Sequence, residues 1–108
     1  NDVEDIVQRL PGCHRGMAVA FAATDERGEH MVLVAETRCS DADARGFALA
    51  SQRAVSAAFA IPRLEVVLVR PGAVPRTTSG KRQRLLVRSR LHDAGFRDSV
   101  IWSSGGLS

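Results

Sequence analysis

The segment Leu64–Val69 limits the possible folds more than any other part of this chain. It is almost entirely apolar, and Pro71 and Gly72 follow it after a single arginine. A short run of this kind, rich in valine and ended by turn residues, is typical of a β-strand buried on both faces. The chain must therefore supply enough helix to cover both sides of a sheet.

Hydrophobic periodicity predicts the other elements. We expect helices over residues 2–10, 40–59 and 83–94 and further strands over 17–23 and 30–36. Ser40, with an acid three residues later, matches a helix N-cap, and the alanine-rich helix after it should bury a stripe through Phe47, Ala50 and Ala54. Gly95 suits the left-handed position that ends the last helix. The predicted fold class is α+β, a small mixed β-sheet of about three strands flanked by helices in the order α-β-β-α-β-α.

Length and composition fit a single globular domain. The chain has 108 residues, of which 44% are hydrophobic and 25% charged, which excludes disordered, collagen-like and coiled-coil proteins. We expect a domain over residues 1–98 and a flexible tail or linker over residues 99–108. No apolar run approaches the roughly 20 residues that cross a bilayer, and the acidic start does not resemble a signal peptide. These features predict a soluble, cytoplasmic protein.

Two cysteines and three histidines offer little for metal or nucleophilic chemistry. Cys13 and Cys39 lie far apart and have no Cys-x-x-Cys spacing, so the sequence predicts neither a disulfide framework nor a zinc site. His14 beside Cys13 is a pair that a metal could use, but a buried thiol and a surface imidazole are the simpler interpretation. We therefore predict no metal site within this chain.

Positive charge is concentrated in the last third of the chain. Residues 70–98 carry eight basic side chains against two acids, whereas residues 1–69 carry seven arginines against ten acids. A cationic end implies an anionic partner, such as a phosphate, a nucleic acid or an acidic protein surface. Lys81 stands out, because fourteen of the fifteen basic residues are arginine. Lysine places a compact ammonium on a flexible stem, which can reach into a closed site.

The segment around Lys81 is the best candidate for chemistry, and it reads Pro71-Gly72-Ala73-Val74-Pro75-Arg76-Thr77-Thr78-Ser79-Gly80-Lys81-Arg82-Gln83-Arg84. It is not a P-loop, because Pro75 stands where the first glycine should be and Arg82 where a hydroxyl should hold magnesium. Prolines stiffen the approach, and Lys81 projects at the start of a helix, where free N–H groups favour anions. The segment can therefore bring a cation to a phosphate or a carboxylate.

This segment resembles the terminal motif of adenylate-forming enzymes, Pro-x-Thr-x-Ser-Gly-Lys-x-x-Arg. That superfamily contains acyl-CoA synthetases, peptide-synthetase adenylation domains, luciferases and fatty acyl-AMP ligases. Asp2-Val3-Glu4 also resembles the Asp-Ile-Glu segment that opens the small C-terminal domain of the family, and the predicted element order is similar. Residues 15–21 and 70–72 are most like fatty acyl-AMP ligases. The resemblance implies the C-terminal lid domain of an acyl-adenylating ligase.

The resemblance also implies a role for Lys81, as the catalytic lysine that bridges the substrate carboxylate and the ATP phosphates while acyl-AMP forms. The other implied site residues are Thr78, Ser79 and Gly80 in the substrate and ATP loop, with Pro75 and Arg84 in support. The implied cofactor is ATP with Mg²⁺, bound mainly by an N-terminal adenylation domain that this chain lacks. The implied acceptor is coenzyme A or the phosphopantetheine of an acyl carrier protein. Without its N-terminal domain, the fragment is expected to be inactive.

Two other functions stay open from the residues alone. One is a small nucleic-acid-binding module that uses the arginine-rich last helix, where Arg84, Arg88 and Arg90 are expected to face outward. The basic segment has no interleaved aromatic residues on which bases could stack, which argues against this module. The other is a protein-interaction domain without chemistry.

Overall fold

The computed structural model describes residues 2–61, 63–77 and 79–104. Within them lies a four-stranded sheet that consists of β1 (Ala18–Asp25), β2 (Gly28–Glu36), β3 (Leu64–Val69) and β4 (Val100–Ser103). The strands lie in the order β1-β2-β3-β4. The β2–β3 pair is parallel, whereas β1–β2 and β3–β4 are antiparallel. The predicted small mixed sheet is confirmed, with one strand more than the three expected.

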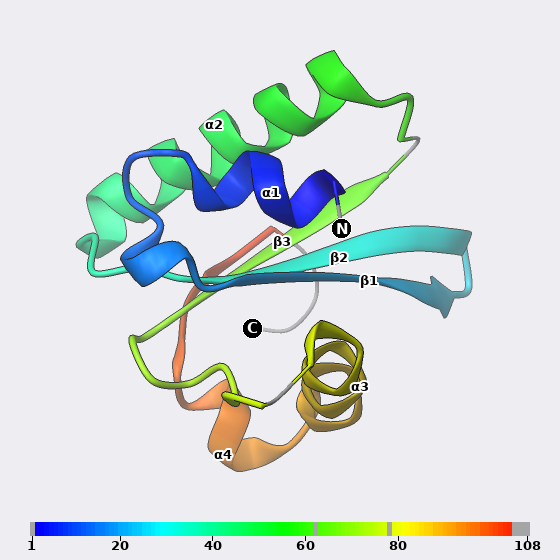
Figure 1. Cartoon of the computed structure of the whole chain (residues 1–108), viewed down its shortest axis with the longest axis vertical. Helices are drawn as coiled ribbons and strands as arrows, with labels where there is room; N and C mark the ends of the chain where they lie inside the picture. The colour runs from blue at the N-terminus through cyan, green and yellow to red at the C-terminus, as the bar shows by residue number, and fades with distance from the viewer. Residues whose placement is uncertain (1, 62, 78, 105–108) are drawn as a thin grey trace.

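Helices cover both faces of this sheet, as Figure 1 shows. One face carries α1 (Asp2–Gln8) and α2 (Asp41–Ala58), and the other carries α3 (Gly80–Arg90) and α4 (Ala94–Arg97). A short 3-10 helix, η1 (His14–Gly16), lies between α1 and β1. The predicted cap of α2 is confirmed, because the Ser40 side chain accepts a hydrogen bond from the backbone N–H of Asp43. The α+β class follows from this arrangement.

The strand β3 belongs to two hydrophobic cores at once. Val66 and Leu68 pack in the core beneath α1 and α2, whereas Val67 and Val69 pack in the core against α3 and α4. All four side chains are fully buried. Burying one valine or leucine stabilises a fold by about 1.5–3 kcal/mol. The continuous apolar run thus reflects a strand that holds both helix layers.

The C-terminal elements correct three predictions. Residues 100–103, predicted as part of a tail, form β4. This strand pairs with β3, where Leu68 lies opposite Trp102 and Val67 opposite Ser103. The last predicted helix is two helices, because α3 begins at Gly80 and ends at Arg90, and α4 follows it. Gly95 lies inside α4, so its predicted role as a left-handed helix end is wrong.

The buried face of α2 also differs from the predicted stripe. The helix buries Ala44, Phe47, Ala48, Ser51 and Val55, whereas Ala50 is exposed. Alanine occurs on every side of this helix, so its hydrophobic pattern does not identify the inner face. Phe47 and Val55 are the largest side chains that α2 buries in the core.

The loop that precedes α3 leaves the sheet beside the end of β2. Because β2 and β3 are parallel, Glu36 pairs with Val69, and the loop begins directly after Val69. Gly72 has φ +90°, a conformation that favours glycine. The N–H of Ala73 closes this turn by donating to the Arg70 carbonyl oxygen at 3.1 Å. The fold therefore places the start of this loop next to the end of β2.

Candidate functional site

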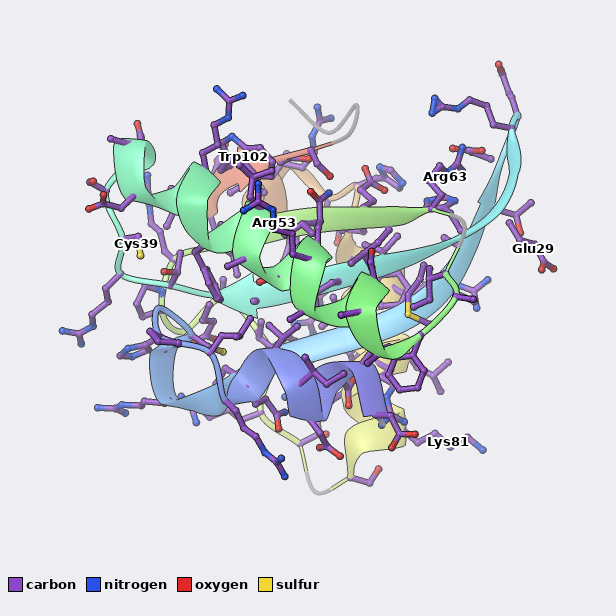
Figure 2. The ribbon with its side chains drawn as sticks, turned by 90° about the horizontal axis from the view of Figure 1, so that it is seen from above. Glu29, Cys39, Arg53, Arg63, Lys81 and Trp102 are labelled. Carbon is purple, nitrogen blue, oxygen red and sulfur yellow. The ribbon has the colours of Figure 1, made fainter. Side chains whose placement is uncertain are left out.

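Lys81 lies in the first turn of α3, and its side chain is exposed. Figure 2 shows this side chain extending away from the body of the protein. Ser79 caps the helix, because its Oγ accepts a hydrogen bond from the N–H of Arg82 at 3.2 Å. The remaining free amides at a helix N-terminus carry partial positive charge. The helix end and the Lys81 ammonium therefore both favour an anion near the start of α3.

Side-chain hydrogen bonds define the path of the loop before Lys81. Thr77 Oγ1 donates to the Ser79 carbonyl oxygen at 2.6 Å, and Gln83 Nε2 donates to the Pro75 carbonyl oxygen at 2.9 Å. The N–H of Gln83 also donates to the Ser79 carbonyl oxygen at 3.1 Å. Pro75 and Ser79 are thereby tied to Gln83 in the first turn of α3, and Thr77 is tied to Ser79. Thr78, a predicted site residue, lies outside the described residues.

Arg84 does not face outward as the sequence predicted. Its Nε and Nη2 donate to the two carboxylate oxygens of Glu4, each at 3.0 Å, which joins α3 to α1. Glu4 Oε2 also accepts from the N–H of Ala20 in β1 at 2.8 Å. A Cβ at Gly80 would lie 3.4 Å from Arg84 Nη2, which is an ordinary van der Waals contact. We call this two-bond ion pair the Glu4–Arg84 clamp.

The electrostatics of the clamp favour the ionised pair. Burial of Glu4 opposes its ionisation, but hydrogen bonds from Arg84 and from the Ala20 N–H outweigh that effect. The pKa of Glu4 therefore lies below its ordinary value, and the hydrogen bond to Glu4 raises the pKa of Arg84. The sequence places Glu4 in a motif, but it carries no local sign that Arg84 is its partner.

A second buried acid, Glu36, contacts the loop from β2. Its Oε2 accepts a hydrogen bond from the N–H of Val74 at 3.0 Å. Glu36 was not among the residues predicted from the sequence to form the site. The only signal was an acid at the end of the run Met31-Val32-Leu33-Val34-Ala35, where a strand is otherwise apolar.

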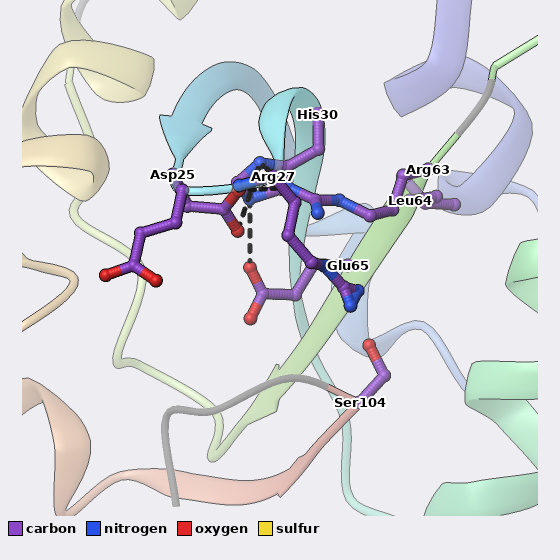
Figure 3. Close-up of a pocket in the computed structure, with 8 residues that line it drawn as sticks. Asp25, Arg27, His30, Arg63, Leu64, Glu65 and Ser104 are labelled. Atoms are coloured by element: carbon purple, nitrogen blue, oxygen red, sulfur yellow. Dashed lines mark hydrogen bonds and ion pairs between the residues drawn. The ribbon is translucent and has the colours of Figure 1, made fainter.

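A cavity of about 700 Å³ lies at the other end of the sheet, where Figure 3 shows its lining. It contains none of the predicted site residues that the structure describes. Arg63 Nη2 donates to Asp25 Oδ1 and to His30 Nδ1, each at 2.7 Å, and His30 Nε2 lies 3.3 Å from Glu65 Oε2. Arginine can only donate, so His30 accepts at Nδ1 and carries its proton on Nε2. The hydrogen bond from Arg63 holds the pKa of Asp25 below its ordinary value. These side chains are hydrogen-bonded to one another. We therefore interpret the network as a structural one rather than as a binding site.

Across residues 2–61, 63–77 and 79–104, no three His, Cys, Asp or Glu side chains are grouped so that they could hold a metal ion. Over the same ranges, every helix is too short or too polar to span a bilayer.

Comparisons with known proteins find relatives that match most of the chain. No family model matches the chain. It is 35% identical over 91 residues to a Mycobacterium tuberculosis protein named probable long-chain-fatty-acid–AMP ligase FadD30, covering 78% of this chain and 15% of that protein. It is 33% identical over 104 residues to long-chain-fatty-acid–AMP ligase FadD26 of the same species, covering 90% of this chain and 17% of that protein.

Solved structures show the same fold. A fatty acid AMP ligase from Legionella pneumophila matches with a TM-score of 0.80 and 20% identity, over 98% of this chain and 19% of that one. A keto acid-selecting peptide-synthetase module matches with a TM-score of 0.74 and 19% identity, over 90% of this chain and 8% of that one. The chain thus corresponds to one domain of much longer proteins, and it spans about one sixth of the curated relatives.

Fold, loop and comparisons together define the class: this is a C-terminal domain of the adenylate-forming enzyme type, and the resemblance stated from its motifs is confirmed. Both curated relatives described above carry the name of a long-chain-fatty-acid–AMP ligase.

Proposed function

We propose that this chain is the mobile lid domain of an acyl-adenylating ligase and that it supplies Lys81 for the activation of a fatty acid by ATP. In that reaction a carboxylate oxygen attacks the α-phosphorus, and the bond from this phosphorus to pyrophosphate breaks. The products are acyl-AMP and pyrophosphate. The Lys81 ammonium would offset the negative charge of the carboxylate and the phosphates as they approach. The observation that carries the proposal is the exposed Lys81 at the start of α3. Ser79 caps this helix start, and hydrogen bonds from Gln83 to the loop and from Arg84 to Glu4 hold it in place.

The face around Lys81 also supports closure onto another domain. Leu85, one turn further along α3, is 57% exposed, which is unusual for a large apolar side chain. A cation beside an apolar contact suits a surface that is covered during the reaction. In our proposal the N-terminal adenylation domain covers it and holds most of the ATP, its Mg²⁺ and the acyl chain. The isolated lid would then be inactive.

The acceptor in the proposed second step is a thiol, either of coenzyme A or of a carrier protein's phosphopantetheine. The exposed Arg82, Arg88 and Arg90 on α3 give the domain a positive surface that suits an acidic carrier protein. The proposal needs no nucleic-acid partner.

Substitution of Lys81 in the complete ligase tests the proposed function. Lys81→Ala should lower acid-dependent ATP–pyrophosphate exchange by about 10²–10³-fold, the usual effect of losing a preorganised charge. Acyl transfer from preformed acyl-AMP should be largely unchanged. Lys81→Arg should restore little, because a planar fork is a poor substitute for a point charge.

The matched control is Arg82→Ala, which removes the neighbouring exposed charge and should leave exchange within a few-fold of wild type. Equal rates for wild type and Lys81→Ala in both half-reactions would show that the assigned role is wrong. Equal losses in Lys81→Ala and Arg82→Ala would indicate a general charge effect instead.

A further inference from the structure

Glu36 is a buried acid that the reaction described above does not use. Its side chain has no exposed surface, although it carries a carboxyl group. Oε2 accepts the hydrogen bond from Val74, whereas Oε1 is buried and has no hydrogen-bond partner among the residues that the structure describes. Burying a polar oxygen without a partner costs stability. The cost of burying this carboxyl group therefore needs an explanation, and its hydrogen bond to the loop provides one.

Val74 is the point where the loop enters the protein interior. Its side chain is 1% exposed and packs in the same core as Val87 of α3. Prolines at positions 71 and 75 have no N–H, so the N–H of Val74 is one of few donors in this stretch. A buried backbone N–H needs an acceptor. The Glu36 carboxyl supplies that acceptor from another strand, 38 positions away in the sequence.

A short series of contacts leads from Glu36 to Lys81. Val74 precedes Pro75, whose carbonyl oxygen accepts the hydrogen bond from the Gln83 side chain. Gln83 lies two residues after Lys81 in the first turn of α3. Glu36 thus fixes one side of the helix start through the loop, while Glu4 fixes the other side through Arg84. Both acids come from elements outside the loop.

We propose that Glu36 is a positioning residue: by holding the N–H of Val74, it sets the position of the loop and therefore of Lys81 for adenylation. The inference rests on the proposed function of Lys81. Glu36 itself does not touch substrate in this proposal, because it has no exposed surface from which to exchange a proton with one. A misplacement of about 1 Å in a catalytic group can lower a rate by about 10²-fold.

The test compares two half-reactions in the complete ligase. Glu36→Ala should lower ATP–pyrophosphate exchange by about 10²-fold and leave acyl transfer from preformed acyl-AMP within about twofold of wild type. Glu36→Gln should restore most of the exchange, because its amide oxygen can accept the same hydrogen bond. A purely structural loss would lower both half-reactions together and would overturn the inference.

Thr37→Val is the matched control. Thr37 is equally buried at the same end of β2, and its Oγ1 accepts a hydrogen bond from the N–H of Cys39 rather than from the loop. This variant should keep wild-type exchange, and an equal loss in Thr37→Val and Glu36→Ala would count against positioning. Wild-type exchange in Glu36→Ala, when Lys81→Ala is impaired, overturns only the inference on Glu36. Unimpaired exchange in Lys81→Ala overturns the proposed function itself.

Amide hydrogen exchange provides a readout that needs no activity. In the 108-residue wild-type chain, the Val74 amide should exchange slowly, and Glu36→Gln should preserve that protection. Rapid exchange of this amide in the folded wild-type chain would overturn the inference, even if Glu36→Ala does not fold.

Discussion

Breaking the Glu4–Arg84 clamp should loosen α3 from α1, and its geometry sets the size of the effect. Both hydrogen bonds measure 3.0 Å and join charged groups. The Glu4 side chain is 10% exposed and that of Arg84 is 31% exposed. A hydrogen bond to a charged group contributes about 1.5–3 kcal/mol. Because the Arg84 side chain is partly exposed, screening by water lowers this contribution. We expect the two side chains to be coupled by about 1–2 kcal/mol.

The assay is a double-mutant cycle on the 108-residue chain, with Glu4→Gln, Arg84→Met and both, followed by urea denaturation at pH 7. Arg84→Met should cost about 2–3 kcal/mol, because it leaves a carboxylate in a buried position without its guanidinium. Each kcal/mol corresponds to about 4 °C in Tm for a chain of this length. Arg88→Met, which removes an exposed arginine of the same helix, should stay within about 0.5 kcal/mol of wild type.

The clamp should also make stability depend on pH. Because the pKa of folded Glu4 lies below its ordinary value, the clamp stabilises the fold above the unfolded glutamate pKa of about 4.3. This contribution disappears as the pH falls through the folded pKa. The advantage of wild type over Glu4→Gln should therefore shrink in acid. A coupling below about 0.3 kcal/mol at pH 7, or an advantage that acid does not reduce, would refute the reasoning.

Two further predictions concern the helix cap and a thiol. Ser79→Ala should lower the free energy of unfolding by about 1 kcal/mol through loss of the N-cap of α3, whereas Ser79→Asp should retain it; equal Tm losses in the two variants would contradict the cap. Burial, and then the Glu36 carboxylate, raise the pKa of the Cys13 thiol to about 11. In a Cys39→Ser background, alkylation of Cys13 at pH 9 should therefore be slow until urea unfolds the chain, and stability should fall as the pH rises from about 9 toward 11. Alkylation of the folded chain at the unfolded rate would show that the thiol is not shielded.

The elements that local patterns predict are those with a strong periodic signal. Leu64–Val69 forms β3 with the predicted bounds, and the Ser40 cap begins α2 as expected. The weak elements were missed for a physical reason. The strand β4 is four residues long and none of its side chains is fully buried, so it depends on pairing with β3 rather than on its own sequence. In α2, alanines on every side conceal the buried face.

The candidate site also has a part that the local sequence predicts and a part that it does not. The sequence by itself determined that Lys81 stands at the start of a helix, after a stiff loop rich in proline and hydroxyl groups, because turn residues and helix caps act over a few positions. Only the tertiary structure decided what holds that loop. Glu4 meets Arg84 across 80 positions and Glu36 meets Val74 across 38. Such partners are chosen by how helices and strands pack, and a single charged residue carries no local sign of the group that it will contact.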